Sequence, residues 1–141
     1  MTYKMLIVDD SLPMRAIIIR TIKASGFKDV QFLEAGNGAE ALDILGKDWL
    51  DLVITDYNMP NMNGMELIQE MKQDDILNAI PVLVVTTEGS KQKVEEFIEK
   101  GAAGYVKKPF TPEAIRLEIN KILGAPEHEG TPESGSDDFD F

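Results

Sequence analysis

Three carboxylates follow two of the most apolar stretches of the chain, which is where an acidic metal site could form. Asp9 and Asp10 come directly after Met-Leu-Ile-Val at 5–8. Asp56 comes directly after Leu-Val-Ile-Thr at 52–55, whose first three residues are apolar. Carboxylates that share one cleft repel each other, and this repulsion raises their pKa values unless a cation compensates. An all-oxygen site with few protein ligands suits Mg²⁺, with Mn²⁺ as a substitute.

A hydroxyl and an ammonium group follow two further apolar stretches. Thr86 comes directly after Val-Leu-Val-Val at 82–85, and Lys108 comes shortly after the Tyr-Val pair at 105–106. A divalent cation and an ammonium group on either side of one carboxylate would fit a phosphoryl group. In such a site Asp56 would be the nucleophile that forms an acyl phosphate, and the Thr86 hydroxyl would donate a hydrogen bond to a phosphoryl oxygen.

These groups meet only if the apolar stretches are neighbouring strands of one parallel sheet, whose carboxyl ends share a rim. The stretches at 5–8, 52–54 and 82–85 show no polar alternation, so both faces of each should be covered. The candidates at 30–33 and 105–106 are shorter or partly polar, which suits sheet edges. The order 2-1-3-4-5 puts the three apolar stretches inside, whereas 3-2-1-4-5 would expose the third at an edge.

Segments with helical spacing separate the strands, and each repeats apolar residues on one face. These residues are Met14, Ile17, Ile18 and Ile22, then Ala41, Leu42 and Leu45, then Leu67, Ile68 and Met71, then Val94, Phe97 and Ile98, and finally Ile115, Ile119, Ile122 and Leu123. We also expect Trp49 to pack at the entry to the third strand. The alternation predicts an α/β protein with a flavodoxin-like, doubly wound, five-stranded parallel sheet and helices on both faces.

Composition limits the class of partner. The 141 residues include 14 basic and 25 acidic side chains and no cysteine. Disulfides and thiolate metal ligands are therefore excluded, and a net charge of −11 argues against nucleic acid and anionic membranes as partners. No apolar run is as long as a membrane span, and acidic residues appear too early for a signal peptide. We expect a cytoplasmic monomer.

The polar residues and their flanking sequences together resemble the receiver domain of bacterial response regulators, most closely the stand-alone chemotaxis (CheY-like) type. The matching stretches are Leu-Ile-Val-Asp-Asp-Ser at 6–11, Asp-Tyr-Asn-Met-Pro at 56–60, Asn-Gly at 63–64, Pro-Val-Leu-Val-Val-Thr at 81–86 and Gly-Tyr-Val-Lys-Lys-Pro-Phe at 104–110. Any one of these stretches is weak evidence. All of them in order, at compatible spacing, make a strong signal that covers nearly all of residues 1–124.

The resemblance implies a role for each residue of the acidic site. Asp56 would accept a phosphoryl group from the phosphohistidine of a histidine kinase. Asp10 and Asp56 would ligate Mg²⁺ together with the backbone carbonyl of Asn58, and Asp9 would act chiefly through water. Lys108 would pair with the phosphoryl group, and the peptide bond between Lys108 and the following proline would be cis.

The resemblance also implies a switch. Thr86 and Tyr105 match a pair in which the hydroxyl moves toward the phosphate and the aromatic ring turns inward. This would re-shape the surface of the fourth helix, fifth strand and fifth helix, here called the output face, where partners of the family commonly dock. Asn58 and Glu88 match positions that tune the lifetime of the acyl phosphate. Thr87 departs from the usual Ala or Gly, and its larger side chain could slow phosphate entry.

The function implied is that of a single-domain response regulator in a two-component system, in chemotaxis, which catalyses only its own phosphorylation and dephosphorylation. The implied partners are a histidine kinase, an output protein such as a flagellar motor switch component, and a phosphatase. A phosphorelay intermediate or a phosphate sink would use the same site, so these alternatives stay open. An aspartyl-phosphate phosphohydrolase would need a second acid at Asn58, whose amide cannot transfer a proton. A flavodoxin-like cofactor binder is disfavoured because Asp9 and Asp10 would repel a flavin phosphate.

Residues 1–124 form the predicted receiver domain, and residues 125–141 form a predicted acidic, flexible C-terminal tail. The tail has six acidic residues and neither Lys nor Arg, a composition that cannot build a core. Its simplest interpretation is a solvating extension. However, its last five residues, Asp-Asp-Phe-Asp-Phe, alternate acids with aromatics, which is unusual for a purely solvating segment, and short segments of this kind can serve as docking peptides. Our hypothesis is that the tail binds a partner or folds back on the output face of its own domain.

Overall fold

A single parallel sheet organises the computed structural model, which describes residues 2–60, 62–87 and 89–124. Strands and helices follow the order β1 (Tyr3–Val8), α1 (Leu12–Ala24), β2 (Val30–Ala35), α2 (Gly38–Leu45), β3 (Leu52–Asp56), α3 (Gly64–Lys72), the short 3₁₀ helix η1 (Leu77–Ala79), β4 (Val82–Thr86), α4 (Lys91–Glu99), β5 (Gly104–Lys107) and α5 (Pro112–Leu123). The strands lie in the order β2-β1-β3-β4-β5, and every neighbouring pair is parallel. The predicted fold class and strand order are confirmed.

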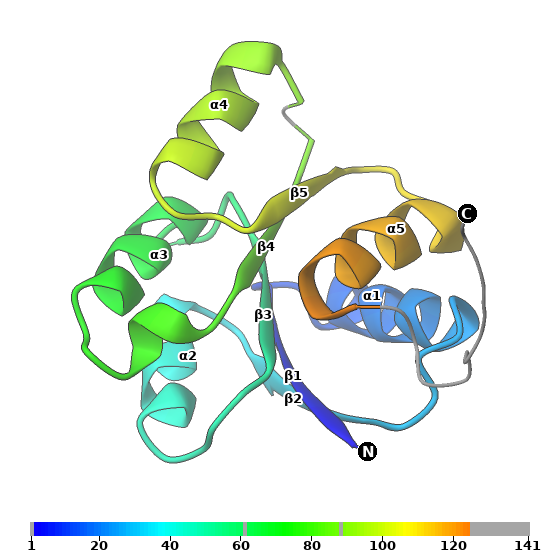
Figure 1. Ribbon diagram of the computed structural model, residues 1–141, viewed down its shortest axis with the longest axis horizontal. Helices are drawn as coiled ribbons and strands as arrows, with labels where there is room; N and C mark the ends of the chain where they lie inside the picture. The colour runs from blue at the N-terminus through cyan, green and yellow to red at the C-terminus, as the bar shows by residue number, and fades with distance from the viewer. Residues whose placement is uncertain (1, 61, 88, 125–141) are drawn as a thin grey trace.

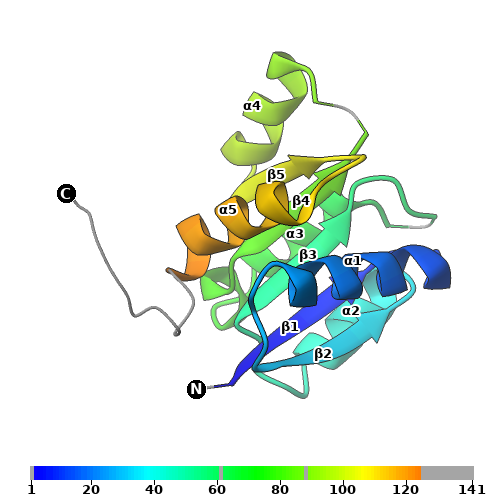
Figure 2. The same cartoon turned by 90° about the vertical axis from the view of Figure 1, so that its right-hand side faces the viewer.

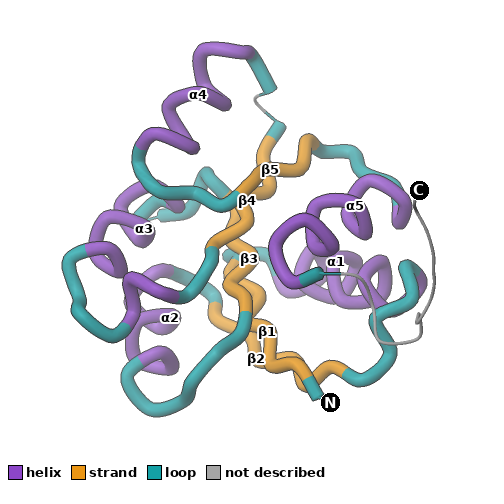
Figure 3. Tube along the Cα trace, viewed as in Figure 1, coloured by secondary structure: helices purple, strands orange, loops and turns teal. Residues whose placement is uncertain are grey.

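Helices cover both faces of the sheet. α1 and α5 lie on one face, and α2, α3 and α4 lie on the other (Figure 1). The Cα tube in Figure 3 shows the strands between these two helical layers, and Figure 2 shows the strand arrows running toward the same side. None of the helices in the described ranges combines the length and the apolarity that crossing a bilayer requires.

The apolar core is divided by the sheet. One cluster joins Ile18 and Ile22 of α1 to Ile115 and Ile119 of α5, and the other contains side chains of α2, α3 and α4. All residues of β3 and β4 are buried, as are the last four residues of β1, whereas the edge strands β2 and β5 keep exposed positions. Each fully buried Val, Leu or Ile contributes about 1.5–3 kcal/mol to folding, so the three inner strands anchor the rim that carries the polar residues.

Side-chain caps begin the five α-helices of the described chain. The caps are Ser11, Asn37, Asn63, Ser90 and Thr111, and each accepts a hydrogen bond from a backbone N–H in the first turn. A cap of this kind contributes about 1 kcal/mol. At α3 the Glu66 carboxylate also accepts a bond from the Asn63 N–H, at 2.9 Å. These caps fix where the chain leaves the rim of the sheet.

Three expectations about packing are wrong. Ile17 and Ile98 were expected on core-facing helix faces, but they are 42% and 47% exposed. Their neighbours Ile18 and Phe97 are buried instead, and a neighbour in a helix points about 100° away, which turns Ile17 and Ile98 outward. Trp49 is 54% exposed and does not pack at the entry to β3.

Candidate functional site

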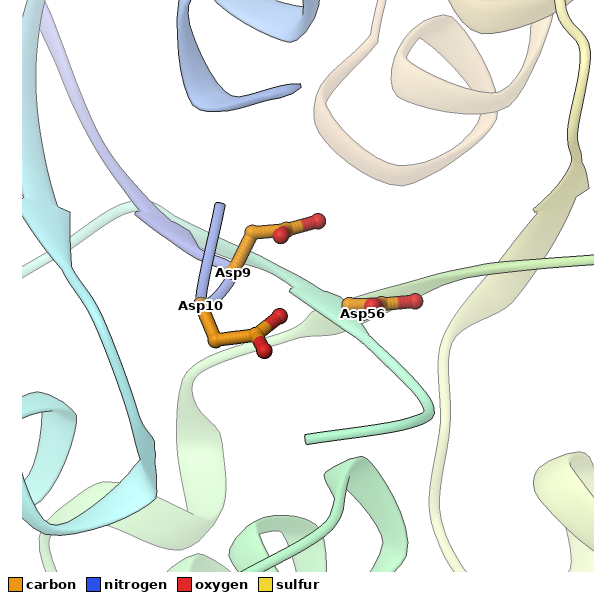
Figure 4. A group of neighbouring side chains, drawn as sticks. All are labelled: Asp9, Asp10 and Asp56. Atoms are coloured by element: carbon orange, nitrogen blue, oxygen red, sulfur yellow. The ribbon is translucent and has the colours of Figure 1, made fainter. Parts of the chain in front are cut away.

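Three carboxylates meet at the carboxyl ends of β1 and β3. Asp9 and Asp10 follow β1, and Asp56 is the last residue of β3. One carboxylate oxygen from each of the three residues lies within 4.8 Å of the others. Figure 4 shows the side chains directed to the same side of the strand ends. The cluster forms because β1 and β3 are adjacent in the sheet, as the strand order 2-1-3-4-5 requires.

Burial makes this cluster costly to charge. Asp9 is 2% exposed and Asp56 is 8% exposed, whereas Asp10 is open to solvent. Burial raises the pKa of the Asp9 carboxyl, and the charges of Asp56 and Asp10 raise it further. A hydrogen bond from the Ser11 backbone N–H, 2.9 Å from Asp9 Oδ1, and the nearby charge of Lys108 lower this pKa.

One oxygen of Asp9 fits a bound cation. Within the described residues, Asp9 Oδ2 is buried without a hydrogen-bond partner. Its nearest cation is Lys108 Nζ at 3.7 Å, an ion-pair distance but too long for a hydrogen bond. A buried oxygen that receives no hydrogen bond, beside two further carboxylates, belongs to the all-oxygen surroundings that a hard divalent cation such as Mg²⁺ prefers, with direct or water-mediated contact. The acidic cluster therefore fits a metal site.

Lys108 brings a positive charge to the same rim. Its Nζ lies 3.3 Å from Asp56 Oδ1, and its side chain is 17% exposed. The Lys108 backbone N–H donates to the carbonyl of Thr86 at 2.7 Å, so the end of β4 positions the loop that carries the lysine. The peptide bond between Lys108 and Pro109 is cis, as the resemblance implied.

The backbone behind Asp56 leaves no room for a side chain. Gly64, the first residue of α3, donates its N–H to the Tyr57 carbonyl at 2.9 Å. A Cβ at position 64 would lie 2.7 Å from the backbone oxygen of Asp56, so only glycine fits there. The Asn63-Gly64 pair thus fixes the start of α3 against the phosphoacceptor candidate. Asn58 lies in the intervening loop and is exposed.

Thr86 and Tyr105 lie on neighbouring strands. Thr86 ends β4 and is fully buried, and Tyr105 of β5 is half-buried against the core cluster beneath α2, α3 and α4. Tyr105 pairs in register with Val84, two residues before Thr86. Because side chains two residues apart share a face of a strand, Thr86 and Tyr105 belong to the same face of the sheet. Thr87 is exposed beside Lys108, and Glu88 lies outside the described residues.

Three hydrogen bonds around the site have no evident signal in the sequence. Arg15 of α1 donates from Nε to Glu34 at 2.8 Å and from its guanidinium to the Asp9 carbonyl, tying the loop after β1 to β2. Lys93 of α4 donates to the Tyr57 hydroxyl at 3.2 Å. The Arg15–Glu34 and Lys93–Tyr57 pairs join residues that are distant in sequence, and all three bonds depend on how α1 and α4 pack against the rim.

The fold and the site together define a receiver domain: an acidic cluster and a lysine at the carboxyl ends of a 2-1-3-4-5 sheet. The model of the response regulator receiver domain family matches residues 5–120. The chain belongs to this family.

Similar proteins and structures agree with this assignment. A chemotaxis protein CheY homolog of Campylobacter jejuni is 41% identical over 131 residues, which cover 92% of this chain and 99% of that protein. Chemotaxis protein CheY1 of Helicobacter pylori is 40% identical over 122 residues, 86% of this chain and 97% of that protein. The structure of CheY4 of Vibrio cholerae is 33% identical with a TM-score of 0.78, covering 87% of this chain and 100% of that one. The predicted CheY-like resemblance is confirmed.

Proposed function

We propose that the chain is a cytoplasmic response regulator in which Asp56 accepts a phosphoryl group from the phosphohistidine of a histidine kinase. The observation that carries the proposal is the position of the Asp56 carboxylate, with the acidic pair Asp9-Asp10 nearby and Lys108 Nζ 3.3 Å away. The similar proteins named for chemotaxis support a role in that process. In this proposal residues 1–124 act as the receiver domain, and the protein acts as a monomer.

In the transfer step, a carboxylate oxygen of Asp56 attacks the phosphorus. An O–P bond forms while the N–P bond of the phosphohistidine breaks, and the imidazole nitrogen keeps the electron pair and takes up a proton. Lys108 Nζ, which pairs with Asp56, would hold one phosphoryl oxygen, and the Thr86 hydroxyl would donate to another. Dephosphorylation is attack of water on the same phosphorus, which returns the carboxylate and releases inorganic phosphate.

Asp10 and Asp56 would hold Mg²⁺, or Mn²⁺, together with the backbone carbonyl of Asn58. Asp9 would act on the ion chiefly through water. The bound ion would offset the negative charge of the phosphoryl oxygens during transfer. The Asn58 side chain and Glu88 would tune how long the acyl phosphate persists.

In this proposal, phosphorylation reaches the output face through Thr86 and Tyr105, which lie on the same face of the sheet. When the Thr86 hydroxyl turns toward the phosphoryl group, the Tyr105 ring would move inward and re-shape the output face formed by α4, β5 and α5. An output protein such as a flagellar motor switch component would bind this face, and a phosphatase would end the signal.

The proposal is tested by incubating the protein with Mg²⁺ and a small phosphodonor and locating the phosphate by mass spectrometry. We expect one base-labile phosphoryl group on Asp56, lost in Asp56→Asn and in the presence of a chelator. Asp75→Asn is the matched control, because Asp75 is an exposed acid before η1 and β4, at the opposite end of the sheet. Labelling of another residue, or labelling that the chelator does not affect, would refute the proposal.

A further inference from the structure

A groove runs between β5 and α5 on the output face. It encloses about 360 Å³ and is lined by apolar side chains that include Tyr105, Phe110 and Leu117. Leu117 is 48% exposed, which is high for a leucine at the centre of a helix. The groove is therefore an apolar surface that the described part of the chain leaves uncovered.

Two lysines mark the ends of this groove. Lys107 is the exposed last residue of β5, and Lys121 lies in the last turn of α5 with 70% of its side chain exposed. The lysines lie at opposite ends because α5 runs antiparallel to β5. Glu118, in the second half of α5, lies beside Gly104, the first residue of β5: a Cβ added to Gly104 would lie 2.8 Å from the Glu118 carboxylate. Lys121 pairs with Glu118 at 3.1 Å, so Glu118 offsets part of its charge, and Lys107 carries more of the groove's net positive charge.

We propose that the last five residues of the chain, Asp-Asp-Phe-Asp-Phe, dock in this groove of their own molecule. In an extended segment, Phe139 and Phe141 point to the same side because side chains alternate with a period of two. The intervening Asp140 and the preceding Asp138 then point away from the floor, where the long lysine side chains at the ends of the groove can reach them. Two aromatic rings suit the apolar floor of the groove, and the acids suit the lysines at its ends.

The length of the chain permits this docking. The tail begins after Gly124, the residue that follows α5. Phe139 lies 15 residues beyond Gly124. Fifteen residues span up to about 50 Å when extended, whereas a 12-residue helix such as α5 is only about 18 Å long. A tethered segment also acts at a millimolar effective concentration, so weak contacts are enough to hold it.

Docking would cover Tyr105 and Leu117, so an output protein would have to displace the tail. This consequence rests on the proposed function, because it assumes that partners bind the output face. The docking itself does not depend on Asp56 phosphorylation and can be tested in the unphosphorylated protein.

A zero-length carbodiimide cross-linker, which joins lysine amines to nearby carboxylates, tests the docking in the full-length protein. We expect cross-links from Lys107 or Lys121 to the acids of the last five residues, identified by mass spectrometry. Phe139→Ser with Phe141→Ser should lower their yield about tenfold, because a few buried aromatic side chains carry most of the energy of such contacts. Leu117→Ser should act in the same direction, and Ile76→Ser, at an exposed site 68% accessible and distant from the groove, is its matched control.

Mixing isotopically labelled and unlabelled protein identifies the chain that supplies the tail. Cross-links within one labelling class support the proposal. Cross-links between the two classes would overturn it, since the tail of a second copy would then fill the groove. Equal yields at Lys47 of α2, on the opposite helical layer, or yields that the phenylalanine substitutions leave unchanged, would also overturn it. None of these outcomes bears on phosphorylation of Asp56, which is measured separately.

Discussion

Asp9 is the most buried of the three acids at the rim, and its carboxylate is repelled by the charges of Asp56 and Asp10. Burial raises the pKa of its carboxyl, so folding favours the protonated form. The favourable contribution of this group is therefore present below its unfolded pKa and is lost as the pH rises through its folded pKa. At neutral pH and without a cation, the ionised Asp9 works against folding.

We predict that Asp9→Asn stabilises the metal-free protein at neutral pH by about 1 kcal/mol, the order expected when one like-charge contact between carboxylates is removed. The gain should shrink near pH 4, roughly the pKa of an unperturbed aspartate, where the wild-type carboxyl is already protonated. Thermal unfolding of both proteins in chelator measures the difference. Asp75→Asn makes the same change of charge at an exposed site and should leave the unfolding midpoint nearly unchanged. A destabilised Asp9→Asn protein at neutral pH would contradict this interpretation.

Thr87 lies beside Lys108, next to the candidate site. It is exposed and lines a small apolar pocket with Lys108, Met14 and Pro109. We predict that Thr87→Ala speeds phosphorylation by a small phosphodonor about threefold, a modest change of barrier. Thr87→Ser keeps the hydroxyl and removes only the methyl group, so it should give most of the same gain if the methyl group is the obstacle. A slower Thr87→Ser protein would show instead that the methyl group helps the reaction.

The positions of the rim residues could be predicted because each residue follows a strand, and the apolar composition of the inner strands indicates where they lie in the sheet. Asp9, Asp56 and Lys108 become neighbours once the strand order is known. The contacts of Arg15 and Lys93 could not be predicted in this way. They depend on the angle at which α1 and α4 lie against the rim, which no local pattern specifies.

Among the elements, α4 is joined to the loop after β3 by its contact with Tyr57. The Lys93 ammonium donates to the Tyr57 hydroxyl and lies 5.0 Å from the centre of the Tyr57 ring. The centre of the Phe97 ring lies 5.3 Å from the centre of the same ring. The hydrogen bond to Tyr57 raises the pKa of Lys93. Because Tyr57 follows Asp56 directly, a change at the proposed phosphoacceptor would have a short path to the proposed output face.

We predict that Lys93→Met loosens the first turns of α4 and makes their amide hydrogens exchange severalfold faster, because it removes the charge and the donor together. Tyr57→Phe should give a smaller effect, since the ring and its contact with Phe97 remain. Lys91→Met, at an exposed position in the first turn of the same helix, is the control. If all three variants exchange alike, the Lys93–Tyr57 contact does not hold α4.

Helix existence and strand order were easier to predict than helix faces. The buried runs of β3 and β4 leave one sensible arrangement, with β2 and β5 at the edges. Ile17 and Ile98 were misplaced because an isoleucine beside the core-facing stripe matches the helical period nearly as well as one on it. Neighbouring helices decide such cases, and their positions are tertiary information.

At the scale of the whole molecule, a divalent cation should stabilise the fold. We predict that Mg²⁺ raises the free energy of unfolding, by about 2.7 kcal/mol when the free ion is at one hundred times its dissociation constant. NaCl at equal ionic strength should give little of this gain, because it screens the acidic cluster without bridging its oxygens. Asp10→Asn should remove most of the Mg²⁺ effect. Equal stabilisation by both salts would mean that only screening is at work.

In the proposed function, the three acids and Lys108 build one site for a metal ion and a phosphoryl group on Asp56. A crystal structure of the protein with Mg²⁺ and beryllium fluoride, a mimic of a bound phosphoryl group, tests it most directly. We predict beryllium bonded to an Asp56 oxygen, Lys108 Nζ in contact with one of its fluorides, and the Mg²⁺ ion held by Asp10, Asp56 and the Asn58 carbonyl. A Mg²⁺ ion bound elsewhere, or beryllium bonded to another carboxylate, would show that these residues do not form such a site.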